Sequence, residues 1–249
     1  MDDQPPIRVE NLKKRFGRQT VLNGITLEVP RAESLAVLGK SGTGKSVLLK
    51  LIIRLQTPDS GSIKINGTEI TGLETEQLNE IRKKIGFLFQ QAALYDSLTV
   101  EENVGFPLMR HSELKESERK DRVRQLLSDV GMDKDLEKHP AQISGGMQKR
   151  VGLARALALD PEILLFDEPT AGLDPITARE ITDLFVKLKE RRKLTSVVVT
   201  HDIHHAEAFA DRVALLKDGD IHLEGTFRSL KRSKDEFAAQ FMRDGSSER

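Results

Sequence analysis

Short apolar runs and longer helical patterns alternate along this 249-residue chain. The runs have the length and the continuous apolar character of strands that are buried on both faces of a sheet. These predicted strands are the apolar start of Ser34–Leu49, then Ile85–Phe89, Ile163–Phe166 and Ser196–Thr200. Helical patterns begin near Lys45 and cover Ile176–Arg191. The alternation predicts an α/β fold with a parallel sheet at its core.

Half-buried strands are predicted towards both ends of the chain. Ile7–Glu10 and Ile25–Val29 alternate between apolar and polar residues, and RFGRQT reads as a turn-rich connection between them. Gly61–Ile65 and Thr68–Ile70 flank Asn66-Gly67, which is a hairpin signal. These segments predict a small antiparallel β layer beside the core. A further hairpin is expected from Val213–Leu216 and Ile221–Leu223.

From Ala92 to about Asp160 the pattern becomes helical and strongly charged, which predicts a helical subdomain inserted into the core. Within Glu113–Val130, one apolar face is expected from Leu114, Val123, Leu126, Leu127 and Val130. We therefore expect a single domain over residues 1–249. Its predicted parts are an α/β core with the β layer (1–91 and 161–225), a helical subdomain (92–160) and a C-terminal tail (226–249). Phe237, Phe241 and Met242 in the tail have helical spacing, so the tail is either a helix folded back on the body or a docking segment.

The composition excludes several classes of protein for this chain. Lys plus Arg equals Asp plus Glu at 39 each, so no overall field attracts nucleic acid, and no nucleic-acid partner is expected. The chain has no cysteine, which excludes disulfides and thiol chemistry and suits a reducing cytosol. No run approaches the ~18 to 20 apolar residues of a membrane-spanning helix, and the N-terminus lacks the pattern of a signal peptide. We expect a soluble chain that meets a membrane only through another subunit.

The sequence GKSGTGKS, between a predicted strand and a predicted helix, has the pattern of a phosphate-binding loop. Its glycines let successive backbone N–H groups point at one anion, and the following helix directs its positive end there. Lys45 supplies an ammonium group for the β- and γ-phosphates, and the Ser46 hydroxyl can hold Mg²⁺. The predicted nucleotide-binding residues are Gly39, Lys40, Ser41, Gly42, Thr43, Gly44, Lys45, Ser46 and Val47.

Polar residues follow the other predicted strands. In an open parallel sheet the ligand lies beyond the carboxyl ends of the strands, so Gln90, Asp167, Glu168 and His201 should meet the loop there. Asp167 is expected to hold the Mg²⁺ shell through water. Glu168 points differently from Asp167 if the strand continues, and it is expected to take a proton from an attacking water. His201 could bond the γ-phosphate or orient that water. Gln90 could reach a metal-bound water or be a polar strand cap. A metal site made by His201, His204 and His205 is a weaker alternative.

Ser144–Gly146 and Phe16 each have both a structural and a functional interpretation. Ser144 has the chemistry of a helix N-cap, and Gly145 and Gly146 leave first-turn N–H groups open to an anion. Phe16 could lie on a nucleotide base or be a hydrophobic plug. The segment Ala171–Pro175 is, by itself, a tight polar turn.

Residues 7–225 together resemble an ATP-binding-cassette (ABC) ATPase, with its RecA-like core. GKSGTGKS resembles the Walker A loop, Gln90 the Q-loop glutamine, ISGGM the signature, ILLFDE the Walker B strand, AGLD with Asp174 the D-loop and His201 the switch histidine. Met147 departs from the family's usual glutamine, and Phe16 takes the place of the aromatic residue that stacks on adenine. The resemblance implies ATP and Mg²⁺ as ligands, and Asp174 as a further residue at the nucleotide.

The resemblance also implies partners. Two copies are expected to associate head to tail around two ATP, with Ser144 to Gly146 of one copy closing on the γ-phosphate held by Lys45 of the other. QAALYDSL resembles the region that contacts a membrane permease, which implies a peripheral position on the cytoplasmic face of the inner membrane. ISGGMQKRVGLARAL followed by DPEILLFDEPTAGLDPI resembles the ATPases of Mla-type phospholipid transporters, which implies an Mce-domain protein and a small regulatory subunit as partners.

Other functions share parts of this pattern. An importer of polar amino acids or another small solute has the same catalytic motifs and is the main alternative. A soluble ABC protein acting on ribosomes or DNA commonly has two fused cassettes or long coiled coils, which this chain lacks. The signature and Glu168 argue against a simple P-loop kinase or GTPase.

Overall fold

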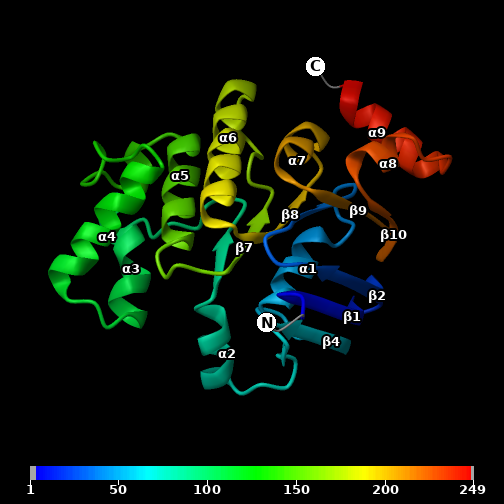
Figure 1. Ribbon diagram of the computed structural model, residues 1–249, viewed down its shortest axis with the longest axis horizontal. Helices are drawn as coiled ribbons and strands as arrows, with labels where there is room; N and C mark the ends of the chain where they lie inside the picture. The colour runs from blue at the N-terminus through cyan, green and yellow to red at the C-terminus, as the bar shows by residue number, and fades with distance from the viewer. Residues whose placement is uncertain (1–3, 248–249) are drawn as a thin grey trace.

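A six-stranded sheet runs through the middle of the computed structural model, which describes residues 4–247 (Figure 1). In spatial order the strands are β10 (Asp220–Gly225), β9 (Arg212–Lys217), β3 (Ser34–Leu38), β8 (Thr195–Thr200), β7 (Ile163–Asp167) and β6 (Ile85–Leu88). All neighbours pair in parallel except β10, which is antiparallel to β9. The predicted parallel core is therefore confirmed.

Both faces of this sheet are buried, which explains the continuous apolar runs in the sequence. Ala36 and Leu38 of β3 pack into one hydrophobic cluster, whereas Leu35 and Val37 pack into another. Side chains of successive strand residues point to opposite faces, so one five-residue strand contributes to both clusters. The first cluster lies under α6 (Pro175–Arg192) and α7 (Ile203–Phe209). The second lies over α1 (Lys45–Ile52).

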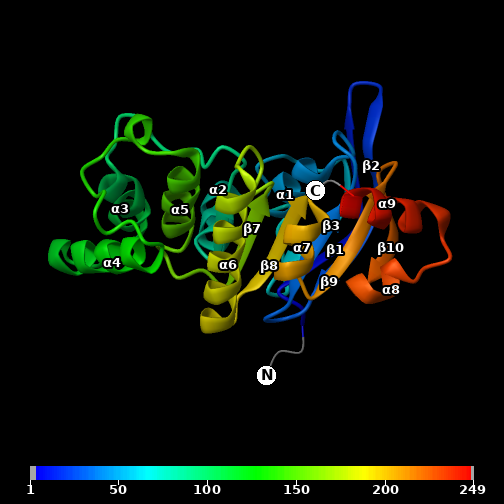
Figure 2. The ribbon, with the colours of Figure 1, turned by 90° about the horizontal axis from the view of Figure 1, so that it is seen from above.

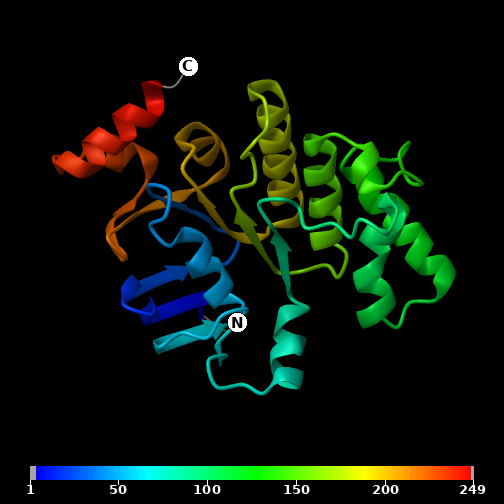
Figure 3. The same cartoon turned by 180° about the vertical axis from the view of Figure 1, so that it is seen from behind.

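A second, antiparallel sheet covers the far side of α1 (Figures 1 and 3). Its strands, in spatial order, are β2 (Gln19–Val29), β1 (Ile7–Phe16), β4 (Ser60–Ile65) and β5 (Thr68–Glu69). The turn predicted within RFGRQT is confined to Gly17-Arg18, because β1 and β2 continue to the pair Phe16↔Gln19. That end of the hairpin projects from the body, so its exposed polar residues can extend the strands without an apolar alternation (Figure 2).

Three helices pack together on one side of the large sheet (Figure 1). They are α3 (Val100–His111), α4 (Glu116–Asp129) and α5 (Gly145–Ala156), with the short 3-10 helix η1 (Pro140–Gln142) before α5. Leu114 was wrongly placed on the apolar face: it precedes α4 and is 37% exposed. The helix begins later because the Glu118 carboxylate accepts a hydrogen bond from the Lys115 amide, at 2.7 Å. The division of the chain into a core and a helical subdomain stays our proposal.

The C-terminal tail folds back on the body as two helices, α8 (Phe227–Lys231) and α9 (Glu236–Ser247) (Figure 3). Ala238 and Met242 are buried in the first cluster, and Lys217 Nζ lies 4.5 Å from the ring centroid of Phe237. Of the two interpretations of the tail, the structure shows the helix folded back. The remaining helix, α2 (Thr75–Arg82), lies before β6. Residues 1–3 and 248–249 of the predicted domain lie outside the described residues.

Candidate nucleotide site

The carboxyl ends of four parallel strands meet at one edge of the large sheet. Leu38 of β3 pairs with Thr200 of β8, and Asp167 of β7 pairs with Val199. Leu88 of β6 pairs with Phe166, one residue before Asp167. The residues that follow these strand ends are therefore neighbours, which confirms the predicted arrangement.

The loop from Gly39 to Gly44 connects β3 to α1 and requires glycine at specific places. Gly42 and Gly44 have φ of +81° and +102°, a region that disfavours other residues. A Cβ on Gly39 would lie 2.7 Å from the carbonyl oxygen of Leu216, so the loop packs closely against β9. A Cβ on Gly42 would meet nothing within 4 Å. The loop is thus held from the sheet side and is open on the other.

Lys45 holds the curl of this loop from inside. Its Nζ donates hydrogen bonds to the carbonyl oxygens of Gly39 (2.8 Å) and Lys40 (3.0 Å), and it lies 3.8 Å from Glu168 Oε1. Only 6% of the residue is exposed. Burial lowers the pKa of Lys45, while the charges of Glu168 and Asp167 oppose that shift. The ammonium group is therefore in place to meet an anion in the loop.

Ser46 and Asp167 bring two oxygen ligands together beside the loop. Ser46 Oγ donates a hydrogen bond to Asp167 Oδ1 at 2.6 Å. Burial raises the pKa of Asp167, and this hydrogen bond opposes the shift. Residues 4–247 contain no group of three or more His, Asp or Glu side chains suited to a metal ion. A hydroxyl and one carboxylate fit Mg²⁺ that takes its remaining ligands from phosphate and water.

Glu168 lies at the centre of the polar cluster. Thr200 Oγ1 donates to Glu168 Oε2 at 2.9 Å, and His201 Nδ1 lies 3.1 Å from both carboxylate oxygens. The strand does not continue past Asp167, because β7 ends there and Glu168 has φ of 45°, so the different directions of the two side chains come from a turn and not from strand alternation. This left-handed turn, fixed by a hydrogen bond from the Glu168 amide to the Val199 carbonyl, directs the carboxylate towards Thr200 and His201.

The three histidines after β8 do not converge. His205 Nδ1 lies 2.8 Å from Thr182 Oγ1, on α6, whereas His201 faces Glu168. His204 is exposed. The metal site of three histidines was therefore a wrong interpretation, and His201 belongs to the carboxylate cluster.

Lys149 and Arg155, on α5, complete the neighbourhood of Gln90 and were missed in the sequence. Lys149 Nζ donates hydrogen bonds to the backbone carbonyl oxygen of Gln90 and, at 3.3 Å, to that of Glu168. Burial lowers the pKa of Lys149 to about 8, and the charges of Asp167 and Glu168 oppose that shift. Helical spacing could have found it, since Lys149 lies three residues after the buried Gly146 and three before the buried Gly152. The Gln90 residue itself is exposed.

The signature segment forms the N-terminus of α5. Ser144 caps the helix by accepting a hydrogen bond from the Met147 amide at 3.3 Å, and both Ser144 and Gly145 are exposed. A Cβ on Gly146 would lie 2.4 Å from the Thr177 side chain, so glycine lets α5 approach α6. Asp174 caps α6 by accepting bonds from the Ile176 and Thr177 amides. A hydrogen bond with the Thr177 side chain lowers the pKa of Asp174 most, and the two amide bonds lower it further.

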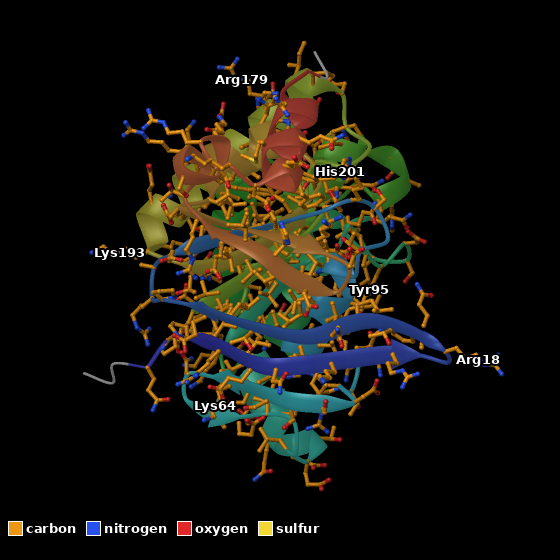
Figure 4. The ribbon with its side chains drawn as sticks, turned by 90° about the vertical axis from the view of Figure 1, so that its right-hand side faces the viewer. Arg18, Lys64, Tyr95, Arg179, Lys193 and His201 are labelled. Atoms are coloured by element: carbon orange, nitrogen blue, oxygen red, sulfur yellow. The ribbon has the colours of Figure 1, made fainter. Side chains whose placement is uncertain are left out.

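Phe16 lies at the end of β1 and is 45% exposed, so it is not a hydrophobic plug. Lys14 Nζ is 5.2 Å from its ring centroid. Figure 4 places Arg18, at the tip of the same hairpin, on the side of the molecule that carries His201. The ring is therefore available to a base on that side.

A phosphate loop, a hydroxyl–carboxylate pair and a glutamate–histidine pair at one sheet edge define a P-loop nucleoside triphosphatase. The sequence pattern of the ABC transporter family matches residues 22–171, and the chain belongs to that family. It is an ATPase that binds ATP with Mg²⁺. In the part of the chain that the structure describes, no helix is long and apolar enough to cross a membrane.

The chain is similar to ATP-binding proteins that are named for the transport of different substrates. The intermembrane phospholipid transport ATP-binding protein MlaF of Haemophilus influenzae is 37% identical over 97% of this chain and 91% of its own length. A probable ribonucleotide transport ATP-binding protein of Mycobacterium leprae is 41% identical over 95% of this chain and 68% of its own length. The methionine import protein MetN of Rhizobium johnstonii is 43% identical over 90% of this chain. The chain spans only 62% of that last relative.

Two solved structures have the same fold. A dimeric ATP-binding cassette in a post-hydrolysis state with ADP and Pi has a TM-score of 0.82 and 37% identity, covering 90% of this chain and 99% of its own. A part of the ABC transporter complex cbiONQ from Clostridium perfringens has a TM-score of 0.84 and 30% identity, covering 98% of each chain. The fold class predicted from the sequence is therefore confirmed.

Proposed function

We propose that this chain hydrolyses ATP as one of two identical subunits that drive a membrane permease on the cytoplasmic face of the cell membrane. The observation that supports this most is a set of three contacts at one sheet edge: Lys45 with Glu168 at 3.8 Å, Ser46 with Asp167 at 2.6 Å, and His201 with Glu168 at 3.1 Å. A charged triphosphate needs such a combination of a cation, metal ligands and a base.

Each group has a proposed role. The loop amides of Gly39–Ser46 and the Lys45 ammonium hold the phosphates, and Phe16 stacks on the base. Ser46, Asp167 and the Gln90 side chain hold Mg²⁺, which when bound neutralises charge on the phosphate oxygens. Glu168 accepts a proton from the attacking water, and His201 orients the carboxylate and contacts the γ-phosphate.

The site of one chain needs a second copy. Ser144 and Gly145 are exposed at the N-terminus of α5, where free N–H groups favour an anion. We propose that this end, together with Asp174, closes on the ATP held by the other copy in a head-to-tail dimer. The similar cassette with ADP and Pi is described as a dimer, which supports the proposal.

The permease is proposed to dock in a groove between β6 and the helices α3 and α5. The groove has a volume of about 450 Å³ and is lined by Phe87, Phe89, Tyr95, Phe106, Arg155 and neighbouring residues. Tyr95 is 47% exposed although its ring lies 4.8 Å from that of Phe106. An exposed aromatic surface of this kind fits a short segment of another protein. Tyr95 also belongs to QAALYDSL, the segment expected to contact the permease.

Phospholipid is the proposed cargo. MlaF of H. influenzae aligns over 91% of its own length, and the methionine-containing signature ISGGM supports the same assignment. An Mce-domain protein and a small regulatory subunit are then proposed as further partners. Import of a small solute is the second candidate, favoured by the similarity to MetN.

Trapping and pull-down test the proposal. Glu168→Gln should abolish turnover but keep ATP binding, so the variant should elute as a dimer with ATP and Mg²⁺ in size-exclusion chromatography. A monomeric variant that still hydrolyses ATP would contradict the assigned base.

Purification of the tagged chain from its native membranes should recover a permease and an Mce-domain protein. A permease recovered with a solute-binding protein, and without an Mce-domain protein, would refute the lipid cargo.

A further inference from the structure

One buried lysine connects two parts of the nucleotide site that are far apart in sequence. Lys149 is 4% exposed, and its ammonium group donates hydrogen bonds to the backbone carbonyl oxygens of Gln90 and Glu168. Gln90 follows β6, and Glu168 follows β7. The lysine itself belongs to α5, which lies beside α6 in Figure 1. A single side chain therefore bonds the backbone of both segments.

The same helix carries three functional positions along its length. Ser144 caps its N-terminus, and Lys149 lies about 7.5 Å further along the axis at 1.5 Å per residue. Near its C-terminus, Arg155 donates to the carbonyl oxygens of Ala92 (2.6 Å) and Ala93 (2.8 Å). Helix α5 thus joins the exposed signature end to the segment after Gln90.

The segment after Gln90 depends on these bonds for its shape. Ala92 and Ala93 have φ of 57° and 49°, a conformation that is unfavourable for residues with a Cβ. Glu168 has the same kind of backbone, with φ of 45°. The Lys149 ammonium can satisfy carbonyl oxygens at both turns at once, because it has three donors on a flexible stem. A movement of α5 would therefore be transmitted to Gln90 and Glu168 together.

We propose that Lys149 is a positioning residue for ATP hydrolysis, which holds Gln90 and Glu168 of its own chain in register with the signature end of α5. The inference rests on the proposed roles of Glu168 and of the signature. When Ser144 engages the nucleotide of the other copy, Lys149 fixes the two turns that carry the metal-ligand glutamine and the base in its own site. The two sites of a dimer are thereby coupled through one helix.

The test compares Lys149→Met with Lys189→Met. Methionine has a similar length and no donor. Lys189 is the matched control, since its Nζ also donates to a backbone carbonyl, that of Phe209, at 3.0 Å, but from α6 to the end of α7. Steady-state ATP hydrolysis gives kcat and KM for each purified full-length variant. Amide hydrogen exchange of residues 89–93 without nucleotide reports the turn directly.

Lys149→Met is expected to lower kcat at least ~5-fold with KM for ATP unchanged within about two-fold. Exchange of residues 89–93 should become faster in this variant and stay unchanged in Lys189→Met. A smaller loss of kcat, a rise of KM in proportion, or unchanged exchange would overturn the proposal. If Lys149→Met does not fold, Lys149→Gln, which keeps an amide NH₂ as donor, takes its place. The proposal then requires faster amide hydrogen exchange of residues 89–93 and a loss of kcat of at least ~2-fold.

A parallel measurement separates this proposal from the function on which it rests. If Glu168→Gln still hydrolyses ATP, the assigned base is wrong, and the exchange of residues 89–93 alone decides the role of Lys149. If Glu168→Gln is inactive and Lys149→Met retains the parent kcat, the proposed function stands and the positioning role does not.

Discussion

The hydroxyl group of Thr200 lies 2.9 Å from Glu168 Oε2 and donates a hydrogen bond to it. Thr200 is the last residue of β8 and is 2% exposed. His201, the next residue, approaches both oxygens of the same carboxylate. The end of one strand therefore supplies two of the groups that orient the proposed base.

Thr200→Val should slow hydrolysis more than it weakens ATP binding. The change removes the hydroxyl donor at nearly constant volume, so the Glu168 carboxylate loses one orienting bond. We expect kcat to fall about 10-fold, equivalent to about 1.4 kcal/mol in the barrier. The matched control is Thr195→Val at the other end of β8, where Thr195 Oγ1 accepts a bond from the Ala32 amide at 2.9 Å. The prediction fails if both variants lose kcat equally in steady-state assays.

Lys45→Ala should remove most of the affinity for ATP. The ammonium is buried inside the loop and also bonds the Gly39 and Lys40 carbonyls, so its loss removes both a cation and a loop contact. We expect Kd to rise at least ~10-fold, or about 1.4 kcal/mol. The stabilisation of the folded state by ATP should shrink accordingly in thermal unfolding, because a ligand raises stability by an amount set by its concentration relative to Kd. An unchanged ATP-induced shift in Tm would contradict the prediction, and unfolding without nucleotide serves as the control.

The buried strands could be predicted from the sequence because burial on both faces leaves a continuous apolar run. Ile163–Phe166 was predicted, and β7 is Ile163–Asp167. The outer parts of β1 and β2 could not be, because polar residues on an exposed hairpin leave no apolar period. Helix α2 was missed as well. Its apolar positions are few, and Leu78 is its buried residue.

The candidate site could be located from the sequence because each strand end carries a polar residue. What could not be predicted is how those residues are held. The turn at Glu168 depends on a hydrogen bond from its amide to the carbonyl of Val199, which belongs to β8. Thr200, the next residue of that strand and 32 residues from Glu168, bonds its carboxylate, and no local pattern encodes contacts over such a separation. In the sequence, Lys149 is one of many charged residues in a predicted helical span, and its charge does not distinguish it from them. Its role depends on tertiary burial against carbonyls of two distant segments.

Met147→Gln should change hydrolysis only modestly. The Met147 side chain packs partly buried against the first hydrophobic cluster, and only its backbone amide bonds Ser144. Glutamine has a similar volume, so the exposed Ser144 and Gly145 should keep their conformation. A loss of steady-state activity beyond ~10-fold, about 1.4 kcal/mol, would show that the thioether has a specific packing role. Ser144→Ala is the informative contrast, since it removes the cap itself, worth about 1 kcal/mol of stability.

The carboxylate of Glu69, on β5 of the antiparallel sheet, should make the free energy of unfolding depend on pH. Glu69 accepts hydrogen bonds from the Ser62 hydroxyl, the Ile63 amide, and the amide and hydroxyl of Thr71. Burial opposes ionisation, but these hydrogen bonds, led by that of Ser62, outweigh it and lower the pKa of Glu69. A lowered pKa in the folded state gives stability that is present above the unfolded pKa and is lost as pH falls through the folded pKa.

Glu69→Gln should therefore be less stable than the parent at pH 7, by about 1 kcal/mol in the free energy of unfolding. The amide can accept fewer of these bonds and carries no charge to strengthen them. Below the unfolded pKa of about 4.3, protonation weakens the same bonds in the parent, so the difference between the two proteins should shrink. Urea unfolding at pH 7, 5 and 3.5 measures it, with Glu113→Gln in an exposed segment as the control. A difference that stays constant over this range would mean that the bonds stabilise the fold without any contribution from the charge of Glu69.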